Sequence, residues 1–154
     1  RSHRRRHWRC SLRVIGSDEP APYRDLAQQL GVADHIDFQG PTLDIQKAYQ
    51  TSDLFVFPSL YDPFANVVLE ALACGLPALT TTTNGSSEII TEEQTGYIIE
   101  GATDNLARDL ADRILKFCNL PPANRLAMRQ AARATAEKYS IKQNAETFVE
   151  KLSQ

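Results

Sequence analysis

The sequence predicts an α/β fold, in which helices cover both faces of a parallel, Rossmann-like sheet. Short apolar runs alternate with segments of helical periodicity at least four times, and this alternation favours parallel strands joined by helices. Residues 54–57 are apolar at every position, as expected of a strand that is buried on both faces. A chain of 154 residues can bury about two thirds of its unfolded surface. We therefore expect one domain at residues 11–154, preceded by a basic segment at residues 1–10.

The charge of the chain is unevenly distributed. The formal net charge is −2, but residues 1–10 carry five of the 17 lysine and arginine residues and no acidic residue. The remainder holds 12 basic against 19 acidic residues, which argues against general nucleic-acid binding. We interpret the basic segment as a truncated helix or a cloning remnant. Contact of its arginines with anionic lipid or phosphate is the alternative.

Cysteine content and hydropathy favour a cytoplasmic protein. The three cysteines are odd in number and lack the spacing of a zinc site, so we expect neither a disulfide framework nor a bound metal. No apolar run approaches the roughly 20 residues of a membrane-spanning helix. The basic N-terminus also lacks the apolar stretch of a secretory signal. A reducing cytoplasm is therefore the expected location.

The first predicted strand, at residues 11–16, does not lead into a dinucleotide-binding loop. It ends at Gly16 and is followed by Ser17, so the glycine-rich fingerprint of NAD-binding proteins is absent. Periodicity and turn residues then predict a helix at 22–30 that ends at Gly31, a strand at 36–39 that closes at Gly40, and a helix at 44–50 with Tyr49 facing inward.

The middle of the chain predicts a loop followed by a buried helix. Asp62-Pro63 indicates the helix start, because proline fits the first turn and an acidic side chain suits the positive end of the helix dipole. From Asn66 to Cys74 nearly every residue is apolar, which favours burial. Glu70 is the exception, and no cationic side chain lies three or four residues from it. Its carboxylate is therefore either a solvated rim group or a ligand contact.

The second half of the chain predicts two more strands and three more helices. Asn84-Gly85 is a turn signal, and Ser86 or Ser87 is expected to cap the short helical turn that follows. Asp104 is expected to cap the next long helix. The strands fall at residues 77–80 and 96–99, and the helices at 106–118, from Pro122 to about Lys138, and after Ser140, which forms a capping box with Gln143.

Three short motifs lie close together in this sequence: Pro58-Ser59, Asp62-Pro63-Phe64, and the run from Val68 to Pro77. Together they resemble the signature of the retaining GT-B glycosyltransferases, a family that includes sucrose and glycogen synthases and many lipopolysaccharide glycosyltransferases. The resemblance extends over residues 11–118. It implies the C-terminal half of a two-domain fold, which is the half that holds the nucleotide-sugar donor.

Two acids form the centre of this resemblance. The family's pattern places two acids eight residues apart, and Asp62 and Glu70 keep that spacing. The first acid of the family is usually a glutamate followed by Pro-Phe-Gly, whereas this chain has Asp62, and Ala65 stands at the glycine position. These departures bear on the identity of the sugar more than on nucleotide binding.

The resemblance also implies a role for each part of the site, without a metal. A glutamate accepts hydrogen bonds from the ribose hydroxyls, helix amides face the phosphates, and the acid with the backbone after it faces the sugar. A strand-closing glycine, and a loop similar to the family's Gly-Gly-x-x-Glu-Ile segment, are candidate base or substrate contacts, with a plain turn as the alternative. The corresponding residues are Glu70 for ribose; Asn66, Val67 and Val68 for phosphate; Asp62, Pro63, Phe64 and Ala65 for sugar; and Gly40, Asn84, Gly85 and Ser86 for the base or substrate loop.

By resemblance, the whole enzyme transfers a hexose from a nucleoside-diphosphate sugar, with a UDP-sugar expected and no further cofactor. The acceptor is a saccharide or glycolipid hydroxyl in cell-surface polysaccharide or lipopolysaccharide synthesis, which allows peripheral contact with the inner face of the membrane. The family's Arg and Lys pair, which neutralises the departing diphosphate, has no match before the first strand, so we expect this chain alone to be inactive. Two alternatives stay open: a nucleotide-sugar epimerase of GT-B fold, and a non-catalytic nucleotide-sugar-binding module.

Overall fold

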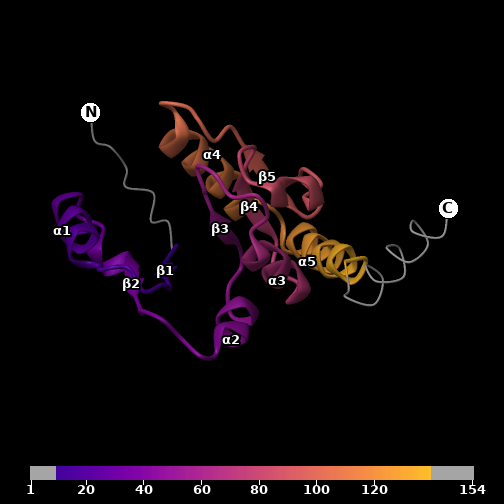
Figure 1. The fold of residues 1–154 in the computed structure, drawn as a ribbon, viewed down its shortest axis with the longest axis horizontal. Helices are drawn as coiled ribbons and strands as arrows, with labels where there is room; N and C mark the ends of the chain where they lie inside the picture. The colour runs from indigo at the N-terminus through magenta and orange to yellow at the C-terminus, as the bar shows by residue number, and fades with distance from the viewer. Residues whose placement is uncertain (1–9, 140–154) are drawn as a thin grey trace. The chain divides into compact units, whose positions relative to one another are not determined.

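The computed structural model describes residues 10–139, which are coloured in Figure 1. The chain divides into two compact units, the first ending at Ile45 and the second beginning at Gln46. Residues 1–9 of the predicted basic segment and the helix predicted after Ser140 lie outside the described residues. Within residues 10–139, no helix is both long enough and apolar enough to cross a membrane.

The first unit is a two-stranded parallel sheet with a helical connection. Strand β1 (Leu12–Val14) pairs with β2 (Ile36–Phe38). Between them lie α1 (Ala21–Gln29) and the 3₁₀ helix η1 (Ala33–His35). Gly31 follows α1 with a φ of 68°, the left-handed conformation in which glycine ends a helix. The predicted strand, helix and strand of this region are therefore confirmed.

The second unit is built on a three-stranded parallel sheet in the order β3-β4-β5. Its strands are β3 (Phe55–Phe57), β4 (Ala78–Thr81) and β5 (Gly96–Ile99). The central strand, β4, is buried at all four positions. By contrast β3 is only half-buried, which corrects the expectation of burial on both faces. The reason is its place in the sheet, because β3 pairs with β4 alone among the described strands.

Helices cover both faces of this sheet, as predicted. Side chains alternate along each strand, so that Ala78 faces one core cluster and its neighbour Leu79 faces the other. The first cluster contains residues of α3 (Asn66–Ala73) and α5 (Pro122–Glu137). The second contains Phe117 of α4 (Leu106–Cys118). Figure 1 shows α4 on one side of the strands and α3 with α5 on the other.

One predicted helix start and one predicted helix cap are wrong. α3 begins at Asn66, with Ala65 at the N-cap position, rather than at Asp62-Pro63. α4 has Asn105 at its N-cap position without a side-chain cap, whereas Asp104 was expected there. In place of an aspartate cap, the Thr103 hydroxyl accepts a hydrogen bond from the Asn105 amide at 3.2 Å. The later start of α3 results from hydrogen bonds that hold the loop before it.

Candidate functional site

The loop after β3 and the loop after β4 meet at the carboxyl edge of the sheet. Parallel strands end at the same edge, where open α/β folds bind their ligands. Asp62 and Asn84 form a bridge of parallel type, and the Gly85 amide donates to the Asp62 carbonyl at 2.8 Å. The structure therefore brings together two of the predicted site segments, the acid-Pro-Phe loop and the Asn84-Gly85-Ser86 loop.

Four hydroxyl groups hold the loop between β3 and α3. Thr80 Oγ1 donates to the carbonyl of Phe57 at 3.0 Å, and Ser86 Oγ donates to the carbonyl of Ala65, also at 3.0 Å. Between these two points, Thr81 and Thr83 both donate to one carbonyl, that of Ser59. We call Thr80, Thr81, Thr83 and Ser86 the hydroxyl clamp. Buried carbonyls outside secondary structure need such partners, and the clamp fixes the path of the loop.

Sequence reasoning missed the role of the clamp, although its signal was present. The threonines form an unbroken run from Thr80 to Thr83 at the end of a buried strand. In this run Thr80 and Thr81 are fully buried, and buried hydroxyls must find hydrogen-bond partners. Ser86, which was expected to cap a helix, is also fully buried and contacts Ala65 instead.

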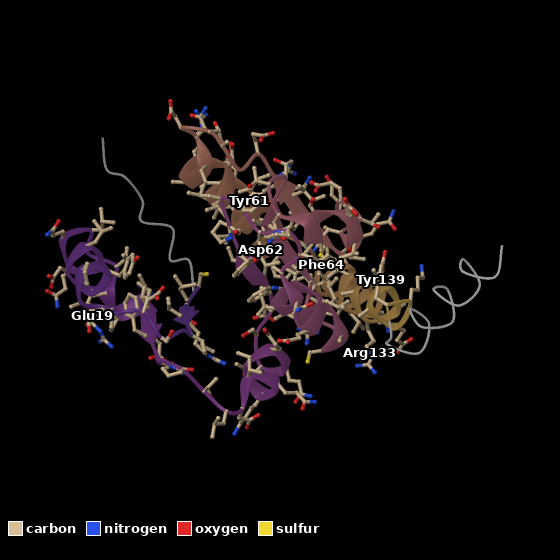
Figure 2. The ribbon with its side chains drawn as sticks, in the orientation of Figure 1. Glu19, Tyr61, Asp62, Phe64, Arg133 and Tyr139 are labelled. Atoms are coloured by element: carbon tan, nitrogen blue, oxygen red, sulfur yellow. The ribbon has the colours of Figure 1, made fainter. Side chains whose placement is uncertain are left out.

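Asp62 organises its own loop. Its Oδ1 accepts a hydrogen bond from the Phe64 amide at 3.0 Å, a local bond typical of aspartate in turns. This bond and the clamp keep Pro63 in the loop, so that α3 starts later than predicted. The neighbouring aromatic rings are open to solvent, with Tyr61 80% and Phe64 40% exposed. Figure 2 marks Tyr61, Asp62 and Phe64 along this loop.

The first turn of α3 follows directly. Asn66 is exposed, Val67 is half-buried and Val68 is fully buried in the core. The amides of the first helical turn have no carbonyl partner within the helix, but the Val68 amide donates to the Ala65 carbonyl at 3.0 Å. This leaves the amides of Asn66 and Val67 as candidates for an anion at this helix end, which the helix dipole also favours.

Glu70 lies one turn further along α3 and is exposed. It has a donor from outside its helix, because the Tyr49 hydroxyl donates to Glu70 Oε2 at 3.2 Å. Tyr49 belongs to α2 (Ile45–Gln50) and is only 4% exposed. Burial, followed by the charge and the hydrogen bond of Glu70, raises the pKa of the Tyr49 phenol. The phenol is therefore protonated, and so a donor, throughout the neutral range.

Asn84, like Ser86, is fully buried, with 0% exposure. Its Oδ1 accepts from the Ser86 amide at 2.9 Å and so caps the 3₁₀ helix η2 (Gly85–Ile89). The cap is therefore Asn84, not Ser86 or Ser87 as predicted. Its Nδ2 has no hydrogen-bond partner within the described part of the chain.

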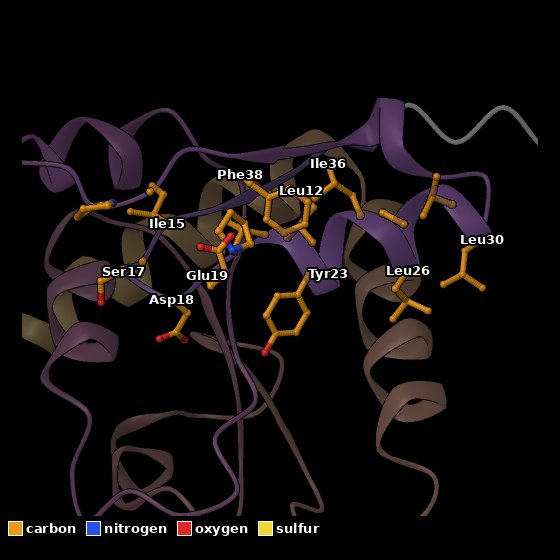
Figure 3. Close-up of a pocket in the computed structure, with 17 residues that line it drawn as sticks. Leu12, Ile15, Ser17, Asp18, Glu19, Tyr23, Leu26, Leu30, Ile36 and Phe38 are labelled. Carbon is orange, nitrogen blue, oxygen red and sulfur yellow. The ribbon is translucent and has the colours of Figure 1, made fainter.

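Gly40 belongs to the first unit, whereas the other predicted site residues belong to the second. It follows β2 with a φ of 69° and lines a largely apolar pocket of about 690 Å³. Figure 3 shows the side chains of β1, β2 and α1 around this pocket, among them Phe38 and Tyr23. All of its lining residues belong to the first unit. The contact of Gly40 with a nucleotide base stays a prediction.

The family model described as "Glycosyl transferases group 1" matches residues 1–135. The chain is 27% identical to the lipopolysaccharide glucosyltransferase WaaG of Escherichia coli K12 over 141 residues, which are 90% of this chain and 37% of WaaG. It is 37% identical to MJ1607, an uncharacterized glycosyltransferase of Methanocaldococcus jannaschii, over 112 residues. That match covers 69% of this chain and 28% of MJ1607.

Solved structures of glycosyltransferases have the same fold. The crystal structure of WaaG matches with a TM-score of 0.75 and 28% identity over 82% of this chain and 34% of that chain. HepE of Anabaena, solved in complex with UDP, matches with a TM-score of 0.77 and 18% identity over 94% of this chain and 41% of that chain. The predicted Rossmann-like fold of GT-B type is thereby confirmed. The chain spans about a third of the length of its first curated relatives.

Proposed function

The chain belongs to the group 1 glycosyltransferase family, and from this premise we propose that it is the donor-binding domain of a retaining enzyme. That enzyme transfers a hexose from a nucleoside-diphosphate sugar, with a UDP-sugar as the donor. The acceptor is a hydroxyl of a saccharide or glycolipid in cell-surface polysaccharide or lipopolysaccharide synthesis. WaaG, by its name, is a lipopolysaccharide glucosyltransferase, and HepE was solved with UDP, which supports this choice.

The pair Asp62 and Glu70 carries the proposal. Glu70 is an exposed carboxylate on a helix that is otherwise buried at Val68, Ala71 and Leu72, and it accepts a hydrogen bond from a buried phenol. A carboxylate that only faced solvent would gain little stability from a hydrogen bond with a buried phenol. A carboxylate that binds two ribose hydroxyls needs a fixed orientation, and its two oxygens offer enough acceptor sites for both hydroxyls and the phenol.

The remaining contacts follow from the same edge of the sheet. The amides of Asn66 and Val67 and the helix dipole of α3 stabilise the diphosphate, whose negative charge grows as the bond to the sugar breaks. Asp62 and the clamped loop after it face the sugar. Leaving-group stabilisation is thus the part of catalysis that these residues supply.

We expect the isolated chain to bind the donor without transferring sugar. The chain spans 37% of WaaG, and the family's basic pair, which neutralises the diphosphate, has no match in it. The part of these relatives that the chain does not span would bind the acceptor and would provide any contact with the membrane surface. Acceptor-dependent release of nucleoside diphosphate at enzymatic rates by the 154-residue chain would contradict this expectation.

Two substitutions test the assigned roles by calorimetric titration with UDP and UDP-glucose. Glu70→Gln is expected to weaken both ligands about ten- to a hundredfold, because both contain the ribose and a charge-assisted bond contributes about 1.5–3 kcal/mol. Asp62→Asn retains an oxygen for the Phe64 amide but removes the charge. It is expected to weaken UDP-glucose and to leave UDP nearly unchanged.

The outcomes separate the roles clearly. Equal losses for both ligands in Asp62→Asn would make Asp62 a loop-forming residue without a sugar contact. Unchanged affinity of Glu70→Gln for both ligands would make Glu70 a solvated rim group. No detectable binding of UDP by the unsubstituted chain would contradict the proposed donor site as a whole.

A further inference from the structure

We propose that Tyr49 is a positioning residue, whose hydroxyl orients the Glu70 carboxylate toward the two ribose hydroxyls of the donor. This inference rests on the proposed function, because it needs Glu70 to bind ribose. Tyr49 lies on a different helix from Glu70 and 21 residues before it. It acts through Glu70 and does not itself contact the donor.

Glu70 needs an external partner to hold one orientation. A glutamate on an exposed helical surface has three rotatable side-chain bonds and loses considerable conformational freedom when it is fixed. Its neighbours at three and four residues are Asn66, Val67, Ala73 and Cys74, and none of them is a cation. The Tyr49 hydroxyl, at 3.2 Å from Oε2, is the side-chain donor that the described residues provide. It engages one oxygen and leaves Oε1 for a ribose hydroxyl.

Tyr49 is itself held in place by the sheet. Its ring packs edge-on against Phe55 of β3, with the ring centroids 5.5 Å apart and an interplanar angle of 87°. Phe55 in turn stacks on Phe57 of the same strand. Edge-to-face packing fixes both the position and the rotation of a buried ring. The phenol oxygen is therefore a fixed point, set by β3, from which the hydrogen bond reaches the exposed face of α3.

The end of α2 is anchored without the Tyr49 hydroxyl. Arg129 of α5 donates to the Ser52 carbonyl at 2.8 Å, and Ser52 Oγ donates to the Ala48 carbonyl at 2.8 Å. Tyr49→Phe keeps the packed ring and these anchors and removes only the hydroxyl. A change in ligand binding in this variant therefore reports on the hydrogen bond and not on the packing of α2.

The test is a double-mutant cycle of Tyr49→Phe and Glu70→Gln in the 154-residue chain. The ligands are UDP and 2′,3′-dideoxy-UDP, titrated calorimetrically, and each variant is first checked for cooperative melting. We expect Tyr49→Phe to weaken UDP about three- to tenfold, the size of one ordinary intramolecular hydrogen bond, because the phenol acts on UDP only through Glu70. Binding of the dideoxy analogue should be unchanged, and the double variant should bind UDP no more weakly than Glu70→Gln alone.

Two further variants keep the test decisive. Tyr97→Phe is the matched control, because Tyr97 is a fully buried tyrosine in the cluster on the other face of the sheet, and its UDP affinity should equal that of the unsubstituted chain. Glu70→Asp withdraws the carboxylate from the phenol and leaves Tyr49 untouched. Adding Tyr49→Phe to Glu70→Asp should then have no further effect, which tests the same link without relying on the Glu70→Gln background.

Each contrary outcome has one meaning. If Tyr49→Phe weakens UDP and the dideoxy analogue equally, or if the losses of the two single variants add, the positioning role is wrong. If Glu70→Gln weakens UDP while Tyr49→Phe does not, the positioning role is also wrong but the proposed function stands. If Glu70→Gln leaves UDP affinity unchanged, the ribose contact fails, and the positioning role fails with it.

Discussion

Gly85 lies directly against Pro63, so that a β-carbon at residue 85 would overlap the Pro63 carbonyl oxygen. The two residues belong to the loops after β4 and β3, and the Gly85 amide also donates to the neighbouring Asp62 carbonyl at 2.8 Å. Only glycine permits two backbones to approach so closely, because it has no β-carbon. The acid-Pro-Phe loop therefore depends for its shape on a residue 23 positions after Asp62, as well as on the hydroxyl clamp.

Gly85→Ala is expected to destabilise the chain by about 1–3 kcal/mol, the usual cost of inserting an atom into a packed region. The loop carrying Asp62 must shift to accept the methyl group. Urea unfolding measures the free-energy change. Gly16→Ala is the control, because a β-carbon at residue 16 meets no atom within 4 Å, and this variant should unfold within about 0.5 kcal/mol of the unsubstituted chain. Equal stability of Gly85→Ala and Gly16→Ala would refute the close contact.

Ser86→Ala is expected to cost about 0.5–1.5 kcal/mol, the net contribution of one intramolecular hydrogen bond. Ser86 is fully buried, and its hydroxyl holds the Ala65 carbonyl at the N-cap of α3. Ser87 is the matched control, since it is the next residue and is only half-buried. Denaturant midpoints of Ser86→Ala and Ser87→Ala provide the comparison, and a larger loss for Ser87→Ala would contradict the clamp.

Strands and long helices could be predicted from the sequence because each has a local cause. Apolar runs ended by glycine or proline marked β1, β2 and β3, and the 3.6-residue period marked α4, whose limits at Leu106 and Cys118 agree with the prediction. The half-burial of β3 could not be predicted, because it results from the position of the strand at the edge of its sheet. That position depends on pairing between distant segments.

The spacing of the two candidate acids could be recognised in the sequence, but the contacts that hold their loop could not. The spacing of Asp62 and Glu70 is a local pattern, whereas the clamp joins residues more than 20 positions apart. Helical periodicity did predict that Tyr49 faces inward, yet its partner is a carboxylate on another helix. The late start of α3 has the same origin, because long-range bonds to the loop prevailed over the local preference of Asp62-Pro63 for a helix start.

Leu72→Ala is expected to destabilise the chain by about 2–5 kcal/mol, as for other leucines whose removal leaves a core cavity. Leu72 is fully buried between α3 and its neighbours in the first core cluster. Leu60, which is 69% exposed, is the control residue. Thermal melts of Leu72→Ala and Leu60→Ala are the measurement, and a similar melting temperature for both variants would mean that α3 is not packed as described.

Two buried tyrosines predict a loss of stability in alkaline solution. Burial is the main cause that raises the pKa of both Tyr49 and Tyr97 above the usual value of 10.0, with nearby carboxylates adding to it. Below pH 10 both phenols are protonated in the folded and the unfolded chain, so their contribution is constant. Above pH 10 the unfolded chain loses these protons while the folded chain keeps them. The free energy of unfolding should then fall by up to about 1.4 kcal/mol per pH unit for each tyrosine.

Urea unfolding between pH 9 and pH 11 measures this slope. Tyr49→Phe and Tyr97→Phe should each make it shallower, because phenylalanine has no proton to lose. The two reductions should add, since Tyr97 belongs to the second core cluster whereas Tyr49 packs on Phe55, which lies against the first. Leu60→Ala is the control, because that side chain is 69% exposed and carries no titratable proton, and its slope should match that of the unsubstituted chain. If the slope of Tyr49→Phe were unchanged, the Tyr49 phenol would ionise as readily in the folded as in the unfolded chain. That outcome would contradict the enclosure of Tyr49 between β3 and Glu70.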